Sequence, residues 1–348
     1  MKPYQKVLIS LLTLIVLGIF GYGGYYVYSI IKFGQSISSG NSDLDRYEQE
    51  LRKNNPDVYI PEVPPEWQGN ERVNILLLGG DARGLTKNDP PRSDTIMVVS
   101  IDPETKQAHL FSVLRDTYVE IPGHRANRVN AALALGSYKL AMETVGQLLG
   151  LDIQYYVFVD FQGFINLVDA IGGIEFEVEK NMYYYDPTDP EYKIDLKKGL
   201  QVLDGKKALQ YVRFRHDRLG DFTRTERQRE LLKALTQKML SATSLLTLPN
   251  TLQKIEPYVS TNIPSDKMLP LARLAYDSAS KGLITAQLPP MQLLREEKIE
   301  GMDVITVNKQ SLQKHVKELL SQVNTEQTTG ESNQSAADSD SKSPSGTF

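Results

Sequence analysis

The sequence predicts an α/β protein in which a central mixed β-sheet is flanked by helices. Apolar runs of strand length alternate with amphipathic stretches of helix length, and glycines end several of them. This alternation continues from residue 71 to residue 320 without a linker-like break or an internal repeat. We therefore expect a single folded domain over residues 71–320.

The first strands are predicted near the start of this domain. Residues 73–80, "VNILLLGG", form a continuous apolar run that glycines stop, which is typical of a fully buried strand. Residues 95–102 and 108–116 have a similar pattern and are expected to be strands as well. A further strand is expected at residues 155–161, and residues 174–180 alternate as a half-exposed strand would.

Helices are predicted between and after these strands. Residues 128–150 form a helical pattern that Gly150 ends. Residues 161–173 predict a short helix closed by a glycine pair, and residues 225–240 predict a longer helix with a leucine stripe. Residues 181–192 mix tyrosines with prolines and acidic residues, which favours a surface hairpin over a loop that stacks on sugars.

An apolar segment precedes the domain. No charge interrupts residues 7–31, which as a helix would extend about 37 Å and exceed the roughly 30 Å hydrocarbon core of a bilayer. Lys2 and Lys6 lie before this run, so the positive-inside rule predicts a cytoplasmic N-terminus. We expect a cytoplasmic segment at residues 1–6, an uncleaved single-pass transmembrane helix at residues 7–31, and an extracytoplasmic domain on the far side of the cell membrane.

The regions that flank the domain are more polar. Residues 32–70 contain a short helical pattern and a proline-rich extended stretch, which predicts a stalk or linker. Residues 321–348 are rich in serine, threonine, glutamine, glycine and acidic residues, and they are expected to form a disordered tail.

Composition excludes several kinds of site. The 348 residues include no cysteine, which excludes thiol nucleophiles, thiolate metal sites and disulfides. None of the four histidines has a partner at metal-ligand spacing. The formal net charge of −4 disfavours nonspecific binding of polyanions such as nucleic acids, so an anion would have to be held by a local pocket.

Arginines are concentrated in one stretch of this acidic chain. The segment "YVRFRHDRLGDFTRTERQRE" holds six arginines and no lysine in twenty residues. In its first part polar and apolar residues alternate, which predicts an extended segment with Arg213 and Arg215 on one face. A helix is expected next, on which Arg224 and Gln228 share a face and Arg227 is adjacent. Because guanidinium groups bind phosphate oxygens in a planar, paired geometry, this stretch indicates an anion site.

Arginine and aspartate also recur together at the ends of three predicted strands, at Asp81, at Arg92 and Asp94, and at Arg115 and Asp116. Ligands of α/β sheets gather at such strand ends, so these side chains are expected to share one site. Carboxylates suit a hard divalent ion such as Mg²⁺, and arginines neutralise the remaining charge of a phosphate that the ion contacts. The pattern therefore predicts a metal–phosphate centre.

Several sequence blocks resemble the LytR–CpsA–Psr family. The resemblance lies in "GGDAR", "RSDT", "LRD", "RVNAALALG", "LDGKKALQYVRFR" and "GDFTRTERQ", which occur in that family's order within about residues 72–320. It implies an α/β/α fold and a phosphotransferase that moves an anionic glycopolymer, such as teichoic acid or capsule, from a polyprenyl-pyrophosphate carrier to peptidoglycan. It also implies Mg²⁺ or Mn²⁺ as the cofactor. The implied partners are the lipid-linked glycopolymer, peptidoglycan and membrane lipid, with no nucleic acid.

The same resemblance assigns roles to individual residues. Asp81 and Asp94 match the aspartates that the family associates with metal. The implied pyrophosphate-binding set comprises Arg92, Arg115, Arg213, Arg215, Arg224 and Gln228. To this set we add Arg227, which adjoins Gln228, and Arg128, which stands where the family often has lysine.

For catalysis we expect Arg115, with Arg213 and Arg215, to stabilise charge as the phosphate bond breaks. Asp94 is the predicted orienter or base, and Asp116 is the alternative base. Two other functions stay open: a pyrophosphatase that releases the polymer to water, and a non-catalytic anchor that only binds anionic wall polymer. An anchor needs arginines but no aspartates at strand ends, so the aspartates favour an enzyme.

Overall fold

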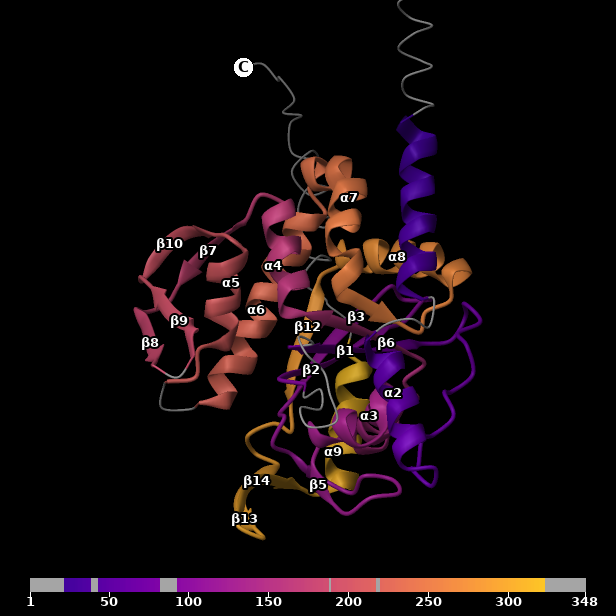
Figure 1. The fold of residues 1–348 in the computed structure, drawn as a ribbon, viewed down its shortest axis with the longest axis vertical. Coiled ribbons are helices and arrows are strands. Elements are labelled where there is room, and N and C mark those ends of the chain that lie inside the picture. Colours follow the sequence, from indigo (N-terminus) through magenta and orange to yellow (C-terminus); the bar gives the residue numbers. More distant parts are fainter. Residues whose placement is uncertain (1–21, 39–42, 82–92, 188, 217–219, 323–348) are drawn as a thin grey trace, which may run out of the picture.

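A six-stranded mixed sheet forms the centre of the molecule (Figure 1). The computed structural model describes residues 22–38, 43–81, 93–187, 189–216 and 220–322. The strand order is β11 (Val259–Thr261), β6 (Tyr155–Asp160), β1 (Val73–Gly80), β2 (Thr95–Ile101), β3 (Ala108–Val113) and β12 (Leu283–Leu288). The pairs β1–β6 and β3–β12 are parallel, whereas β1–β2, β2–β3 and β6–β11 are antiparallel. The predicted α/β class and mixed central sheet are therefore confirmed.

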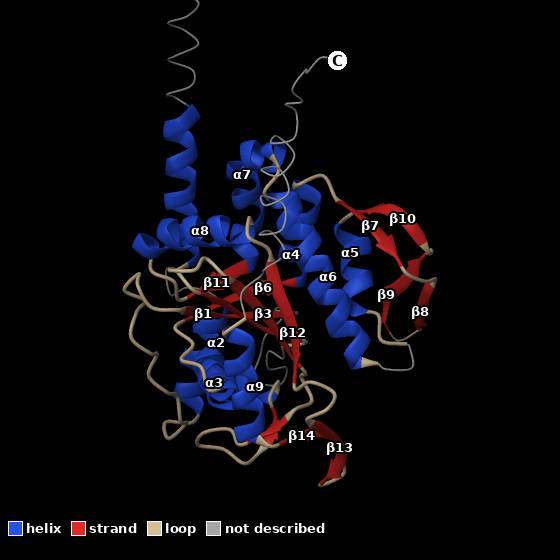
Figure 2. Cartoon of the chain, turned by 180° about the vertical axis from the view of Figure 1, so that it is seen from behind, coloured by secondary structure: helices blue, strands red, loops and turns tan. Residues whose placement is uncertain are grey.

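Helices cover both faces of this sheet (Figure 2). One face carries α2 (Asp43–Asn54), α3 (Ala131–Leu149) and α9 (Lys309–Leu320), and the other carries α4 (Phe161–Ala170), α7 (Ala242–Ile255) and α8 (Ser265–Ala279). Successive strand residues point to opposite faces. In β1, accordingly, Leu76 packs into the core of the α3 side, whereas Val73 packs into the core of the α8 side.

A third core lies beside the sheet. It joins α5 (Gly205–Arg213) and α6 (Asp221–Met239) to two small antiparallel pairs, β7 (Ile174–Val178) with β10 (Gly199–Leu203) and β8 (Met182–Asp186) with β9 (Asp189–Leu196). The β8–β9 pair confirms the surface hairpin predicted for residues 181–192. The remaining elements are β4 (Tyr118–Val119), β5 (Asn127–Arg128), the 3₁₀ turn η1 (Glu256–Tyr258), β13 (Leu294–Ile299) and β14 (Met302–Val307).

The helix α3 confirms the prediction that Gly150 ends a helix, because Gly150 adopts the left-handed conformation with φ 73°. One feature of α3 was missed. Gly136 and Ser137 have non-helical dihedrals inside it and form a kink. The buried Ser137 hydroxyl donates to Glu48 of α2 at 2.9 Å, so α2 holds this kink in place. The segment predicted as a stalk thus contains a helix that packs on α3 through the buried Leu44.

The extended conformation predicted for the start of the arginine stretch is wrong. Residues up to Arg213 belong to α5, whose N-terminus is capped by the Asp204 carboxylate, which accepts from the Lys207 amide at 2.8 Å. The buried residues Ala208, Tyr211 and Phe214 recur every third position, which is a helical spacing. Only five or six residues alternated in the sequence, and such a short run fits either structure.

The N-terminal helix is described over residues 22–37 and lies beside α7 and α8. Within the described residues, no helix combines the length and apolarity needed to cross a bilayer. The predicted transmembrane helix at residues 7–31 falls largely outside the described part, as does the predicted tail from residue 323 onward.

His109 on β3 should make the stability of the fold depend on pH. Burial, reinforced by the charge of Arg72, lowers the His109 pKa from 6.5 to about 4. Between pH 6.5 and pH 4, His109 is therefore protonated in the unfolded chain but neutral in the folded chain. The free energy of unfolding decreases as pH falls through this interval. Between pH 7 and pH 5 the loss of unfolding free energy caused by His109 is about 2 kcal/mol. In melting curves of the full chain, His109→Leu should lose less stability over this interval than the wild type does, and equal losses would contradict the assignment.

Candidate functional site

Three strand ends meet at one edge of the central sheet, as predicted. The amide of Asp94, just before β2, donates to the carbonyl of Gly79 in β1 at 3.0 Å. Asp81 follows the end of β1 and is exposed. Arg115 follows β3, and its guanidinium donates to the Asp94 carboxylate at 2.5 Å. The predicted meeting of Asp94 with Arg115 is therefore present, whereas Arg92 lies outside the described residues.

Arg115 is the centre of a cluster of carboxylates. Besides Asp94, its Nε atom lies 3.6 Å from an oxygen of Asp116 and 3.7 Å from an oxygen of Asp221. Burial disfavours the charged guanidinium, but the three nearby carboxylates outweigh burial and raise the Arg115 pKa. Arg115 is therefore held as a cation with a fixed orientation at the edge of the sheet.

The first turn of α6 brings a second ion pair to this edge. Arg224 Nη2 lies 2.6 Å from Asp221 Oδ1, and Arg224 Nη1 lies 3.9 Å from Asp94 Oδ1. The Arg224 side chain is 3% exposed. Burial raises the Asp221 pKa although Arg224 and Arg115 oppose this, and burial lowers the Arg224 pKa although Asp221 opposes that. Both charges are thus poorly solvated and depend on each other.

This ion pair is close but badly angled for hydrogen bonds. Within the described residues, both carboxylate oxygens of Asp221 and the Nε and Nη2 atoms of Arg224 are buried without a hydrogen-bond partner. The Nε atom of Arg115 is also buried without a hydrogen-bond partner. Unsatisfied buried polar atoms are costly, so this cluster of unsatisfied donors and acceptors is a candidate site for a polar ligand.

Arg213 is the last residue of α5, and Arg215 follows it at the cluster. Arg215 is half-buried, and its charge acts on both Asp221 and Arg224. The Arg213 guanidinium lies over the ring of Phe161, 4.8 Å from its centroid. Arg215 therefore belongs to the cluster itself, and Arg213 stands beside the start of α4.

The other predicted arginines mainly contact protein groups. Buried Arg227 donates to Glu179 at 2.9 Å and to the carbonyl of Phe214 at 2.6 Å. Gln228 donates to the carbonyl of Val212 at 3.4 Å. These contacts fasten α6 to the chain that carries Arg213 and Arg215.

Arg128 on β5 has a similar anchoring role at another edge of the cluster. It donates to the carbonyl of Asp303 at 2.6 Å, and its Nε atom lies 3.4 Å from an Asp116 oxygen. It therefore links Asp116 to the chain at the start of β14.

Asp221 is the residue that sequence reasoning missed. It contacts both Arg115 and Arg224, although it was not among the predicted site residues. It lies in the family block "GDFTRTERQ", but an aspartate at the start of a helix is common in proteins for capping reasons alone. The packing of α6 against the end of β3 gives it a place in the site.

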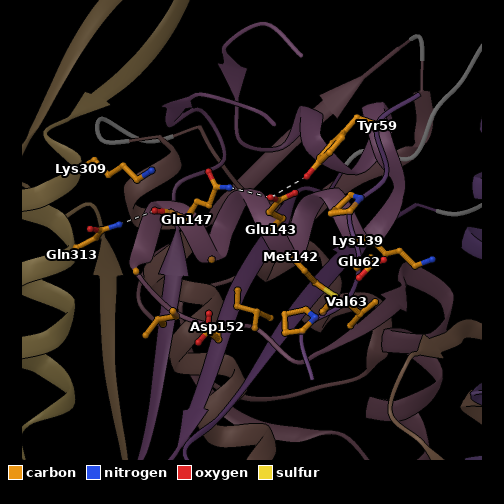
Figure 3. Close-up of a pocket in the computed structure, with 16 residues that line it drawn as sticks. Tyr59, Glu62, Val63, Lys139, Met142, Glu143, Gln147, Asp152, Lys309 and Gln313 are labelled. Carbon is orange, nitrogen blue, oxygen red and sulfur yellow. Dashed lines mark hydrogen bonds between the residues drawn. The ribbon is translucent and has the colours of Figure 1, made fainter. Parts of the chain in front are cut away.

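A pocket of about 560 Å³ lies away from this cluster, between residues 59–64, α3 and α9 (Figure 3). Its lining includes Glu143, which accepts hydrogen bonds from Tyr59 and Gln147. The lining also includes Asp152, which shortly precedes β6 and so lies at the amino end of that strand. Because β6 runs parallel to β1, the pocket lies at the opposite edge of the sheet from Asp94 and contains none of the predicted site residues.

Comparison with known proteins places this arrangement in a family. The chain is 36% identical over 215 residues to the regulatory protein MsrR of Staphylococcus aureus, covering 61% of this chain and 63% of that protein, which is less than two thirds of its length. It is 33% identical to the polyisoprenyl-teichoic acid–peptidoglycan teichoic acid transferase TagU of Bacillus cereus, covering 77% of this chain and 83% of that protein. TagT of Bacillus subtilis, solved with bound octaprenyl pyrophosphate lipid, has 26% identity and a TM-score of 0.54 over 76% of this chain and 96% of its own. Residues 28–321 match the LytR_cpsA_psr family, and the chain therefore belongs to that family.

Proposed function

We propose that this protein transfers an anionic glycopolymer from a polyprenyl-pyrophosphate carrier to peptidoglycan and forms a phosphodiester. The observation that carries the proposal is the group of buried and half-buried guanidiniums, Arg115, Arg215 and Arg224, held by aspartates at one sheet edge. The bound lipid of TagT and the name of TagU support the same assignment.

Charge balance supports a phosphate substrate together with a cation. Arg115, Arg128, Arg215 and Arg224 lie near Asp94, Asp116 and Asp221, which offset all but one of these four positive charges. A pyrophosphate diester that enters this partly buried place adds negative charge, which is costly unless a cation accompanies it. A divalent ion that binds with the substrate would restore the balance.

The residues fit Mg²⁺ or Mn²⁺ as that ion. Asp81 and Asp94 stand at neighbouring strand ends and offer hard oxygen donors. In the part of the chain that the structure describes, no three acidic or histidine side chains gather as a complete metal cage. Mg²⁺ commonly takes one or two carboxylates and completes its shell with water and substrate phosphate, so two aspartates suffice. When bound, it would neutralise phosphate oxygens and polarise the phosphorus centre.

The proposed reaction is a displacement at phosphorus. A peptidoglycan sugar hydroxyl attacks the phosphorus linked to the glycopolymer, a new P–O bond forms, and the bond to the departing polyprenyl phosphate breaks. Asp94 is better placed than Asp116 to receive the hydroxyl proton, because its side chain is 40% exposed against 24% for Asp116 and Arg115 orients it. Asp221 is more deeply buried and serves to position Arg224. Arg115 and Arg215 stabilise the charge that develops on the phosphate oxygens.

The proposal includes a membrane anchor. The apolar residues 7–31 would cross the cell membrane with the N-terminus in the cytoplasm, and the α/β domain would stand outside. A lipid-linked donor is confined to the bilayer, so an anchored enzyme remains near its substrate. A reporter fused after Phe348 should be active only as an extracytoplasmic enzyme, and cytoplasmic activity would contradict this topology.

The test is a transfer assay with the full-length protein, a synthetic lipid-pyrophosphate donor and peptidoglycan fragments. We expect a phosphodiester-linked product that requires both the donor and Mg²⁺. Release of free polymer without attachment would instead indicate a pyrophosphatase. Donor binding without turnover would indicate a non-catalytic anchor.

Arg215→Lys should reduce transfer with little change in melting temperature. Lysine keeps the charge but loses the planar, paired donors that match phosphate oxygens. Hydrogen bonds to charged groups contribute roughly 1.5–3 kcal/mol, so we expect a rate loss of about one to two decades. Arg229→Lys, a change in the same arginine stretch but outside the proposed set, should leave the rate unchanged. Full activity in Arg215→Lys would remove Arg215 from the phosphate site.

A further inference from the structure

The helix α7 lies alongside the N-terminal helix and runs in the same direction (Figures 1 and 2). Near one end, the hydroxyl of Tyr22 donates to the carbonyl of Leu246. Near the other end, the hydroxyl of Ser36 donates to Glu256 at 2.5 Å. The first half of α7 therefore reaches to the level of residue 22, where the described part of the chain begins.

This half of α7 is free of charge. Residues 240–253 contain no acidic or basic side chain, and the nearest charges along the chain are Lys238 and Lys254. Leu246 is 63% exposed, and Ala242 and Thr243 are also exposed. A single exposed leucine is ordinary, but an uncharged helix with its leucine outward beside an apolar segment suits a lipid environment.

The length of the apolar run that precedes Tyr22 indicates how deeply α7 would lie in the bilayer. The fifteen residues 7–21 could cover at most about 22 Å as a helix, whereas the hydrocarbon core is about 30 Å thick. About 8 Å, or roughly five more residues, must then come from the part that begins at Tyr22. Leu246 contacts Tyr22, so it would lie about 8 Å inside the extracytoplasmic edge of the hydrocarbon region.

We propose that the first half of α7 inserts into the extracytoplasmic interface of the bilayer as a second membrane contact. The proposal rests on the transmembrane assignment made above for residues 7–31. Its ligand is the lipid surface, which Leu246 and the neighbouring uncharged residues meet.

The second contact would determine how the domain sits on the membrane. The helix α6 ends just before α7 and carries Asp221 and Arg224 in its first turn. Its nineteen residues span about 28 Å, so α6 acts as a spacer between the bilayer and the arginine cluster. With only the N-terminal helix as an anchor, the domain could rotate about it, and the donor pyrophosphate would meet the site less often.

The absence of cysteine permits a direct test in the full-length protein. Leu246→Cys is labelled with an environment-sensitive fluorophore, and the protein is reconstituted into phosphatidylglycerol–phosphatidylethanolamine vesicles with or without lipids that carry a quencher. We expect Leu246→Cys to lose most of its fluorescence when the quencher lipids are present.

Two further single-cysteine variants make the result decisive. Leu269→Cys in α8 is a matched control, because Leu269 is 60% exposed and adjoins Met268, which packs on Gly34 about 18 Å further along the N-terminal helix. It should keep its fluorescence. Leu14→Cys, within the predicted membrane span, should be quenched.

Quenching at Leu14→Cys without quenching at Leu246→Cys would overturn the insertion of α7 and leave the anchor intact. Equal quenching at Leu246→Cys and Leu269→Cys would also overturn it, since the contact would then not be specific to α7. Absence of quenching at all three positions would overturn the anchor as well. The transfer assay on the unlabelled protein reports separately on the proposed reaction.

Discussion

Asp94→Asn is expected to abolish most transfer activity and to weaken its dependence on Mg²⁺. The substitution keeps the shape of the side chain but removes the charge that would hold the ion and the group that would accept the proton. General bases contribute about 10²–10⁴-fold to rates, so the turnover number should fall by at least that range. The measurement is the rate of transfer from the synthetic lipid donor, followed against Mg²⁺ concentration.

A matched control separates loss of chemistry from loss of structure. Asp102 lies just beyond the other end of β2, where it forms an ion pair with Arg72 at 2.8 Å and accepts from two turn amides. Asp102→Asn should lower the melting temperature but leave the Mg²⁺ dependence of the rate unchanged. Asp94→Asn should show the reverse pattern. Wild-type turnover of Asp94→Asn at limiting Mg²⁺ would show that Asp94 is not a metal ligand.

Arg224→Met is expected to cost both stability and activity. Removing the guanidinium leaves Asp221 buried without its closest cation, and breaking a buried pair typically costs about 3–5 kcal/mol of unfolding free energy. Transfer should also fall by about 10²–10³-fold, the usual effect of losing one donor that stabilises developing charge. The two effects are measured by melting curves and by the transfer assay.

A double variant distinguishes these two contributions. Replacing a buried ion pair by apolar residues is often close to neutral, so Arg224→Met combined with Asp221→Leu should recover most of the stability. It should not recover transfer, because the proposed phosphate-binding donor of Arg224 is still missing. Arg273→Met on the exposed surface of α8 is the control and should change neither quantity. Transfer at the wild-type rate by the double variant would mean that Arg224 only stabilises the fold.

The anchoring arginines should behave differently from Arg215. Arg227 donates to Glu179 and to a backbone carbonyl, so its guanidinium donors already bind acceptors of the protein itself. Its substitution should lower the melting temperature first and reduce transfer as a consequence. The contacts of Arg227 with protein groups thus distinguish it from Arg215, which we propose to bind the phosphate.

Local patterns in the sequence determined several strands and helices, although not α5 or the kink in α3. A continuous apolar run stopped by glycines predicted β1, and Gly150 marked the end of α3. These predictions succeed because both features depend on residues that are near neighbours along the chain. A strand buried on both faces is a continuous apolar run, and a helix that ends in the left-handed conformation usually has glycine there. The aspartates and arginines at strand ends were also visible, because strand ends of an α/β sheet are recognisable without knowing the strand order.

Only the tertiary structure decided which of these charged residues meet. Asp221 lies more than a hundred residues from Arg115 in the sequence, yet the packing of α6 on β3 brings their charged atoms to 3.7 Å. The packing of α6 beside β7 likewise brings Arg227 to Glu179. Residue type and local period fix which face of an element a side chain occupies. The partner that it finds there depends on how distant elements pack, and no local pattern contains that information.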